Sequence, residues 1–307
     1  MKIGFIGVGA MGQPMAEHLL RAGYPLYAYD TTPARLEPLR EQGAIAAEDA
    51  AAVVREADVI CLSLPSSDSC VQVAEAVILP HIATGQIVID FGTTTPPETR
   101  RLAGLLKGKG AFWFEAPLSG GDNGAKKGKL RIFAGGDLEI FQRVQPILET
   151  VGGKETLTYC GPSGAGQVVK GVNQLAMGLG AAAYLESVAF GVRAGVAPDI
   201  IARAVGGEND RWRTMVLHMA RAAQEERAEN VGVKFRELPY FLREAWEAGL
   251  ELPLTEALYA FCDAGPRVVV DDNRPAPSFW HELMHRQKND ARTDDTDNTN
   301  NTDNEDG

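Results

Sequence analysis

One lysine stands alone in a long uncharged stretch of the chain, GAGQVVKGVNQLAMGLG, residues 164–180. Lys170 is the only charged residue within 157–184, and its neighbours are Gly, Ala, Val, Leu and Met. An amine among apolar residues loses water on folding, which favours its neutral form and lowers its pKa. Such an amine can take a proton from an alcohol or return one to a carbonyl oxygen. Asn173 and Gln174 lie one helical turn further on. The alternative to a catalytic role is that Lys170 is a structural residue whose amine reaches solvent.

A glycine-rich turn near the start of the chain indicates a second chemistry. It follows an apolar strand pattern, opens a helical one, and matches GxGxxG: Gly7-Val8-Gly9-Ala10-Met11-Gly12. In a dinucleotide-binding turn the three glycines allow a tight bend, close approach of pyrophosphate and close helix–strand packing. Asp30, eighteen residues after Gly12, is expected to accept hydrogen bonds from ribose hydroxyls and to repel a 2′-phosphate. The pattern therefore predicts NAD as the cofactor, with NADP less favoured. The positive charge of Arg35 nearby reduces that preference. The alternatives are a turn without a ligand and Asp30 as a helix N-cap before Pro33.

A third candidate feature is the Ser119-Gly120-Gly121 turn, which follows a strand pattern in FEAPLSGGDNGAKKGKL, residues 114–130. A serine hydroxyl and adjacent backbone N–H groups suit an anion such as a substrate carboxylate. The alternative is an ordinary turn that leads into a helix.

The candidate site residues must be positioned by secondary-structure elements, and the first half of the chain predicts a regular series of strands and helices. Short apolar runs alternate with helix-period segments such as 10–21, 33–42, 97–106 and 138–151. The runs that we interpret as strands are 2–7, 25–30, 58–64, 86–91, 111–116 and 129–135. Strands that are apolar throughout are typical of sheets covered on both faces. The alternation predicts an α/β, Rossmann-type, doubly wound and mainly parallel sheet.

The second half predicts helices only. The expected helices are 163–194, 198–205, 211–228, 235–248, 253–264 and 278–286. We therefore expect a nucleotide-binding domain at 1–161 and an all-α domain at 162–286. The remainder, 287–307, is a low-complexity run of Asp, Asn and Thr that cannot bury a core, so we expect a disordered acidic tail.

Composition narrows the class of protein. The chain has 307 residues, is 45% hydrophobic and 23% charged, and carries a net charge of −11. This balance fits a soluble globular protein and argues against a nucleic-acid-binding surface. The four cysteines form no CxxC pair and indicate reduced thiols in the cytoplasm. The first residues run directly into a strand pattern and no long apolar window is free of polar breaks, so we expect neither a signal peptide nor a membrane span.

Together the motifs resemble the β-hydroxyacid dehydrogenase family, of the 3-hydroxyisobutyrate dehydrogenase and tartronate semialdehyde (2-hydroxy-3-oxopropionate) reductase type, related to 6-phosphogluconate dehydrogenase. The resemblance covers about residues 1–285. It rests on the N-terminal IGFIGVGAMGQPMAEHLLRAGY, on DFGTTTPPETR at 90–100, on EAPLSGG at 115–121 and on GxGxxxKxxN at 164–173. The departures are Glu115 for Asp, Leu118 for Val, Gln174 where Asn is frequent, and Arg236-Glu237-Leu238 for Lys-Asp-Leu.

The resemblance implies an NAD(P)-dependent oxidoreductase that interconverts a small 3-hydroxy acid, of the 3-hydroxyisobutyrate or D-glycerate type, and its semialdehyde. Lys170 would be the catalytic acid/base. The substrate carboxylate would be held by Ser119, Gly120 and Gly121, with Asn173, Gln174 and Arg236 completing the substrate site. Leu64, Pro65 and Thr95 would line the cofactor cleft. The family also implies a homodimer or homotetramer built through the helical domain.

Other functions remain open at this point. An imine reductase shares the architecture but usually lacks the lysine, and a non-catalytic dinucleotide-binding protein would have no use for a buried lysine beside Ser-Gly-Gly. His281-Glu282-Leu283-Met284-His285 matches HExxH, the pattern of a helical zinc site. No convincing third ligand follows it, so we expect no metal.

Overall fold

The computed structural model describes residues 1–208, 210–233, 239–262 and 278–285. Its contacts divide the chain into two compact units: Met1–Ala183 with Gly232–Pro277, and Tyr184–Val231 with Ser278–Gly307. This division falls inside the long helix α9 (Ala165–Arg193), not before it. The domain limits expected from the sequence stay a prediction, and the expected acidic tail lies outside the described residues.

The first unit is built on a nine-stranded sheet in the order β3-β2-β1-β4-β5-β6-β8-β7, with β9 paired to β8. The strands are β1 (Ile3–Ile6), β2 (Leu26–Tyr29), β3 (Ile45–Ala46), β4 (Val59–Leu62), β5 (Ile87–Asp90), β6 (Phe112–Glu115), β7 (Leu118–Ser119), β8 (Arg131–Gly135) and β9 (Leu157–Gly161). Among these strands only the pairings of β8 with β6 and β7 are antiparallel. The prediction of a mainly parallel sheet is confirmed.

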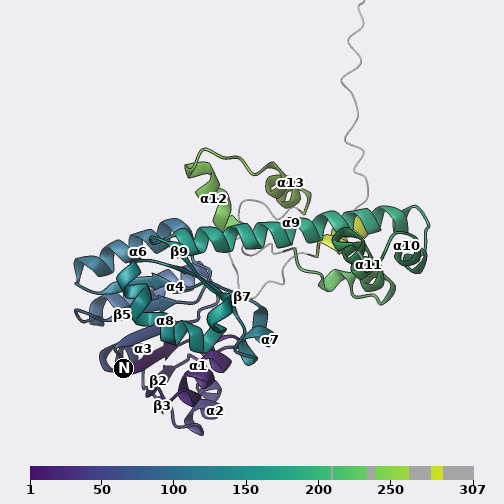
Figure 1. Cartoon of the computed structure of the whole chain (residues 1–307). Coiled ribbons are helices and arrows are strands. Elements are labelled where there is room, and N and C mark those ends of the chain that lie inside the picture. The colour runs from purple at the N-terminus through teal and green to yellow at the C-terminus, as the bar shows by residue number, and fades with distance from the viewer. Residues whose placement is uncertain (209, 234–238, 263–277, 286–307) are drawn as a thin grey trace, which may run out of the picture. The chain divides into compact units, whose positions relative to one another are not determined.

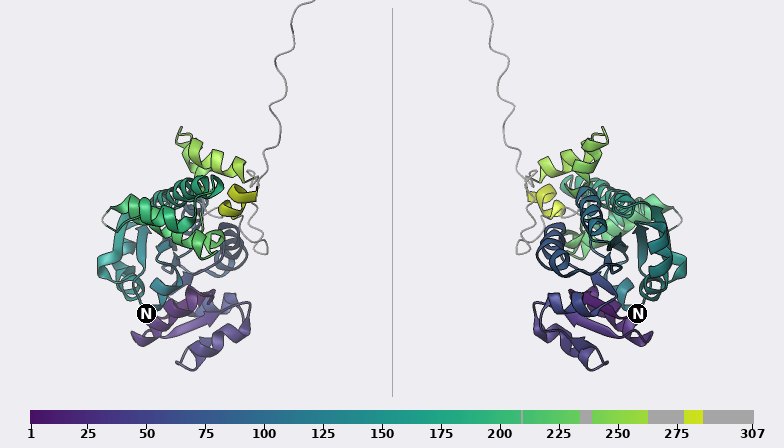
Figure 2. Two further views of the ribbon diagram at one scale, coloured as in Figure 1. Left: turned by 90° about the vertical axis from the view of Figure 1, so that its right-hand side faces the viewer. Right: turned by 90° about the vertical axis from the view of Figure 1, so that its left-hand side faces the viewer.

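Helices cover both faces of this sheet (Figure 1), as the doubly wound prediction requires. Side chains of α1 (Gly12–Arg21), α7 (Gly121–Lys126) and α8 (Leu138–Gly152) share one apolar core, which includes Ile3 and Phe5 of β1. Side chains of α3 (Ala50–Glu56), α4 (Ser67–Val73) and α6 (Pro96–Gly108) share the other, which includes Ile6. Figure 2 shows the same helical layers from two further sides. The remaining helical segments before α9 are η1 (Pro33–Leu36), α2 (Glu37–Arg40), η2 (Ala74–Ile78), α5 (Leu79–His81) and η3 (Lys154–Thr156).

Two later helices, α12 (Pro239–Glu247) and α13 (Pro253–Phe261), also belong to the first unit. Arg100 of α6 donates two hydrogen bonds to the carboxylate of Glu244 on α12, at 3.0 and 2.6 Å. Phe241 of α12 packs so closely on Gly171 of α9 that an added Cβ there would lie 2.6 Å from its ring. These contacts fix α12 beside the first part of α9.

The helix α9 is long and apolar enough to span a membrane, with a mean hydropathy of 1.5 in its most apolar window. Among the helices of the described residues, it alone meets these criteria of length and composition. The core helix of a soluble protein passes the same test. A third of that window, 33%, is buried inside the protein. Gln167, on the first turn of the helix, bonds to the sheet unit: its amide donates to the carbonyl oxygen of Gly92 at 3.1 Å.

The second unit contains the last part of α9 together with α10 (Pro198–Ala204), α11 (Arg211–Gln224), η4 (Ala228–Asn230) and α14 (Phe279–His285). Its buried apolar residues include Val216 and Ala220 of α11 and Phe279 and Trp280 of α14. The prediction of a helical second half is confirmed for the described residues.

Candidate active site

The glycine-rich turn joins β1 to α1, and two of its three glycines are required by the protein itself. Gly7 has φ +91°, and a Cβ there would lie 2.4 Å from the carbonyl oxygen of Ser63. A Cβ on Gly12 would lie 2.0 Å from the carbonyl oxygen of Gly7. At Gly9, in contrast, a Cβ would meet no protein atom within 4 Å. Glycine at that position leaves room for a ligand to approach the backbone, so the turn fits a dinucleotide pyrophosphate.

Asp30 follows β2 and is buried against the same turn. Its Oδ2 accepts a hydrogen bond from the backbone N–H of Val8 at 2.9 Å, and its Oδ1 accepts one from Thr32 at 2.8 Å. The guanidinium of Arg35 lies 3.4 Å from Oδ1. The carboxylate therefore organises the loop in a local turn, and the alternative that it caps the helix at Pro33 is wrong, because that N-cap is Thr32.

A cavity of about 850 Å³ opens beside Asp30 and the glycine turn. Of the predicted cofactor residues it is lined by Gly7, Gly9, Ala10, Met11, Asp30, Leu64 and Pro65, while Val8 and Gly12 are buried behind it. Its far wall is formed by residues that the sequence patterns did not indicate: Asp49, Ala50, Ala51, Gln72, Val73, Ala76, Val77 and His81. Part of this wall is the π-helical segment η2, for which the sequence carries no mark.

A second cavity, of about 670 Å³, brings together residues from distant parts of the sequence. Ser119, Gly120, Gly121, Lys170 and Gln174 line it, and it shares Met11, Ser63, Leu64 and Pro65 with the first cavity. The shared lining places the two cavities side by side. A group that fills the first can therefore reach the residues of the second.

Lys170 projects from α9 and is 5% exposed. Its Nζ donates a hydrogen bond of 2.6 Å to the carbonyl oxygen of Leu118, the residue before Ser119. The alternative of a lysine whose amine reaches solvent is therefore wrong. The contact aims the ammonium at the turn that was predicted to hold a carboxylate.

Asn173 and Gln174 play different parts in this arrangement. The amide nitrogen of Asn173 lies 3.4 Å from the hydroxyl oxygen of Ser119 and 2.9 Å from Oε1 of Gln174. Asn173 is not among the residues that line the cavity, whereas Gln174, 2% exposed, is. Asn173 thus holds two lining side chains in place.

The turn at Ser119 leads from β7 into α7 through two glycines in the left-handed region. Gly120 has φ +134° and Gly121 has φ +62°, conformations that other residues rarely adopt. Ser119, Gly120 and Gly121 all line the cavity.

The loop after β5 approaches the same cavity, but through other residues than expected. Thr95 lines neither cavity, and its N–H donates to the hydroxyl of Ser67 at 3.1 Å. Phe91, Gly92 and Thr93 line the second cavity instead. The buried Asp90 holds this loop by accepting hydrogen bonds from the Gly92 N–H at 2.8 Å and the Thr94 hydroxyl at 2.6 Å, and its burial raises its pKa.

The expected Arg236 lies outside the described residues. On the α12 segment that follows, Tyr240 lines the second cavity, and so does Met177 of α9. The sequence patterns indicated neither residue.

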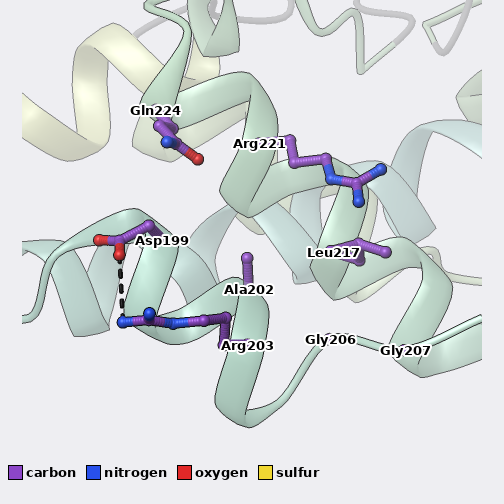
Figure 3. Close-up of a pocket in the computed structure, with 8 residues that line it drawn as sticks. All are labelled: Asp199, Ala202, Arg203, Gly206, Gly207, Leu217, Arg221 and Gln224. Atoms are coloured by element: carbon purple, nitrogen blue, oxygen red, sulfur yellow. Dashed lines mark ion pairs between the residues drawn. The ribbon is translucent and has the colours of Figure 1, made fainter.

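A third cavity, of about 390 Å³, lies in the second unit between α10 and α11 (Figure 3). Arg203 pairs with Asp199 at 3.2 Å on its wall, and Arg221 comes from the opposite helix. No residue that the sequence singled out lines it.

The histidines of the HExxH pattern lie on α14, where their rings stack at 4.3 Å. Among the described residues no three potential metal ligands come together.

Comparison with known families matches two consecutive models. The NAD-binding domain of 6-phosphogluconate dehydrogenase matches residues 2–161, and the NAD-binding domain of NADP-dependent 3-hydroxyisobutyrate dehydrogenase matches residues 164–274. The 2-hydroxy-3-oxopropionate reductase of Escherichia coli K12 is 34% identical over 300 residues, which cover 94% of this chain and 99% of the relative.

Two solved structures share the fold at lower identity. A 3-hydroxyisobutyrate dehydrogenase of Mycobacterium tuberculosis has a TM-score of 0.73 at 24% identity, over 92% of this chain and 97% of that one. A Streptomyces aurantiacus imine reductase has a TM-score of 0.60 at 19% identity, over 92% and 98%. The family match covers more than half of the chain and the bacterial reductase aligns along nearly all of it. The chain therefore belongs to the β-hydroxyacid dehydrogenase family of NAD(P)-dependent oxidoreductases.

Proposed function

We propose that this NAD(P)-dependent hydroxyacid dehydrogenase interconverts a small 3-hydroxy acid, of the 3-hydroxyisobutyrate or D-glycerate type, and its semialdehyde. The observation that carries the proposal is the place of Lys170: its buried amine faces the Ser119 turn, in a cavity that adjoins the nucleotide cavity. A proton carrier, an anion-binding turn and a cofactor cleft then meet in one place.

The nicotinamide ring of the bound cofactor supplies or accepts the hydride. Lys170 takes the hydroxyl proton during oxidation and returns it to the carbonyl oxygen during reduction. In its cationic form the same amine stabilises negative charge on that oxygen. The hydrogen bond to the Leu118 carbonyl oxygen fixes its direction.

The substrate carboxylate is held at the turn beside the lysine. The Ser119 hydroxyl and the backbone N–H groups of Gly120 and Gly121 are the donors. Asn173 orients the Ser119 hydroxyl, and Gln174 offers an amide on the cavity wall. Arg236 is a further proposed contact for the substrate.

The cofactor we propose is NAD in preference to NADP. Asp30 places a carboxylate where a 2′-phosphate would approach, while Arg35, 3.4 Å away, offsets part of that repulsion. We expect NADH to bind at least about tenfold more tightly than NADPH, since tenfold corresponds to only 1.4 kcal/mol of like-charge repulsion. Asp30→Asn, which keeps an acceptor for the loop, reduces the ratio, and Arg35→Ala increases it. Fluorescence titration measures both constants; NADPH binding as tight as NADH in the wild type would contradict the assignment.

Turnover tests the reaction itself. The wild type is assayed with both cofactors against 3-hydroxyisobutyrate, D-glycerate, tartronate semialdehyde and 4-hydroxybutyrate. Lys170→Ala is expected to lower kcat by about 10²–10⁴-fold, the usual contribution of a general acid or base, with NADH affinity unchanged. Lys154→Ala, an exposed lysine, is the matched control. Full activity of Lys170→Ala would disprove the role of the lysine.

Two other functions are decided by the same assay. The imine reductase is a structural neighbour at lower TM-score, so cyclic imines are included as substrates. Turnover of imines but not hydroxy acids would replace the proposal. Cofactor binding without turnover of any substrate would indicate a non-catalytic protein.

We also propose that the protein is cytoplasmic and forms a homodimer or homotetramer, without nucleic-acid or membrane partners. Val172 on α9 is 63% exposed, and Val168 and Val169 on the same helix are 37% exposed each; exposed apolar residues on one helix support a contact between copies. Light scattering in solution measures the number of copies directly, and a monomer at all concentrations would refute the assembly.

A further inference from the structure

Glu115 is a fully buried acid that the proposed reaction does not use. It ends β6, with 0% exposure, and lies three residues before Leu118 and four before Ser119. The strand that carries Glu115 therefore continues directly into the turn at the substrate cavity.

The Glu115 carboxyl group reaches from the sheet to the start of α9. Its Oε1 accepts hydrogen bonds from the backbone N–H groups of Gly164 at 2.6 Å and Gly166 at 3.2 Å. The hydroxyl of Ser163 donates to Oε2 at 3.3 Å. The first N–H groups of a helix have no partner within the helix, and this carboxyl supplies one from another element.

Glycines make room for this contact. A Cβ on Gly166 would lie 2.4 Å from the carbonyl oxygen of Phe133, and a Cβ on Gly135 would lie 2.2 Å from Oε1 of Glu115. The helix start thus lies directly against β8, with the carboxyl group between them.

Among the described residues, Arg100 on α6 is a cation that interacts electrostatically with Glu115. The titratable groups Tyr159 and Cys160 on β9 also interact with it, and Asp90 is its register partner on β5; none of these three carries a positive charge. Burial raises the pKa of Glu115 to about 7, against the effect of its hydrogen bonds. The hydrogen bonds from Gly164, Gly166 and Ser163 favour the charged form and oppose the effect of burial.

We infer that Glu115 is a positioning residue that sets Lys170 against the substrate turn, an inference that rests on the proposed function. Several contacts join the start of α9 to the strand and turn that carry Glu115. Glu115 holds Gly164 and Gly166, and further along the helix Lys170 bonds to Leu118 and Asn173 lies 3.4 Å from Ser119. Without Glu115 the first turn of α9 loses its bonds to β6, and a shift of the helix start would carry Lys170 and Gln174 away from Ser119.

Three variants test this inference. Glu115→Ala removes the acceptor, whereas Glu115→Gln keeps one oxygen for Gly164 and Gly166. Asp137→Ala is the matched control, because Asp137 accepts from Glu139 at the start of α8, which lines neither the nucleotide nor the substrate cavity. Each is assayed for kcat, KM for substrate and cofactor, and amide hydrogen exchange of residues 164–170.

We expect Glu115→Ala to lower kcat by about 100-fold with cofactor KM unchanged, the cost of a misplaced catalytic group. Glu115→Gln should restore most of that loss, and Asp137→Ala should keep the wild-type kcat. Exchange at the start of α9 should rise about tenfold in Glu115→Ala alone. Wild-type kcat in Glu115→Ala, or a loss matched by Asp137→Ala, would overturn the inference. A wild type that turns over no substrate refutes the proposed function instead, and exchange then decides whether Glu115 holds α9.

Discussion

The buried carboxyl group of Glu115 predicts how the stability of the fold depends on pH. Burial raises its pKa from 4.5 to about 7, and hydrogen bonds from Gly164 and Gly166 offset part of the rise. A pKa that is higher in the folded state stabilises the fold below 4.5, and this stabilisation is lost as the pH rises through about 7. At 1.36 kcal/mol per pKa unit, ionisation inside the fold costs about 3 kcal/mol.

Glu115→Gln is the perturbation that isolates this cost, because the amide has nearly the same shape and does not titrate. Free energies of unfolding in urea are measured for wild type and variant between roughly pH 4 and pH 8, which brackets both pKa values. The chain has two compact units, so the transition used is the one that the buried Trp113 of the sheet unit reports. All other titrating groups are common to both proteins and cancel in the difference.

As the pH rises over this range, the free energy of unfolding of the wild type is expected to fall by about 3 kcal/mol relative to that of Glu115→Gln. The loss should be centred between the two pKa values. A difference that stays constant within about 1 kcal/mol would refute the argument, because it would mean that the carboxyl group ionises as easily inside the fold as outside it.

The glycines allow further predictions. Gly12→Ala forces a Cβ to 2.0 Å from the Gly7 carbonyl oxygen and should cost about 3 kcal/mol or more in urea unfolding, at the upper end for overpacking. Gly9→Ala meets no protein atom within 4 Å, so it should unfold within about 0.5 kcal/mol of wild type yet bind NADH more weakly; unchanged affinity would contradict the site. Gly171→Ala pushes on the Phe241 ring at 2.6 Å and should raise substrate KM, and Phe241→Leu in the same chain should relieve it; an additive double variant would show that the two do not contact.

Local sequence patterns predicted much of the fold and several residues of the candidate site. The turn at Gly7–Gly12 was predictable because glycine spacing, strand and helix all act within twenty residues. Lys170 was noticeable because an isolated charge in an apolar helix has few structural explanations. The helix that carries it was predicted at 163–194 and spans Ala165–Arg193.

The rest depends on contacts that no local pattern records. β3 and β7 have two residues each, too short for any periodicity to show, and β9 was not predicted either. Thr95 was expected in the cleft from its motif, but the bonds of Asp90 turn Thr93 towards the cavity. Glu115 and Gly164 are 49 residues apart in sequence, and only the fold brings them together.

The π-helical segment η2 makes one wall of the nucleotide cavity sensitive to chain length. Its closing bond runs from the Leu79 N–H to the Ala74 carbonyl oxygen, five residues back, where an α-helix would need only four. Deleting one residue here would let the turn close as an α-helix and leave the residues after it in register, because a π-turn holds one residue more than an α-turn. The side chains that would change on that wall are those of the widened turn itself, Ala76 and Val77. A single-residue deletion in this segment can therefore alter the cofactor pocket locally, without any substitution and without turning the helix that follows.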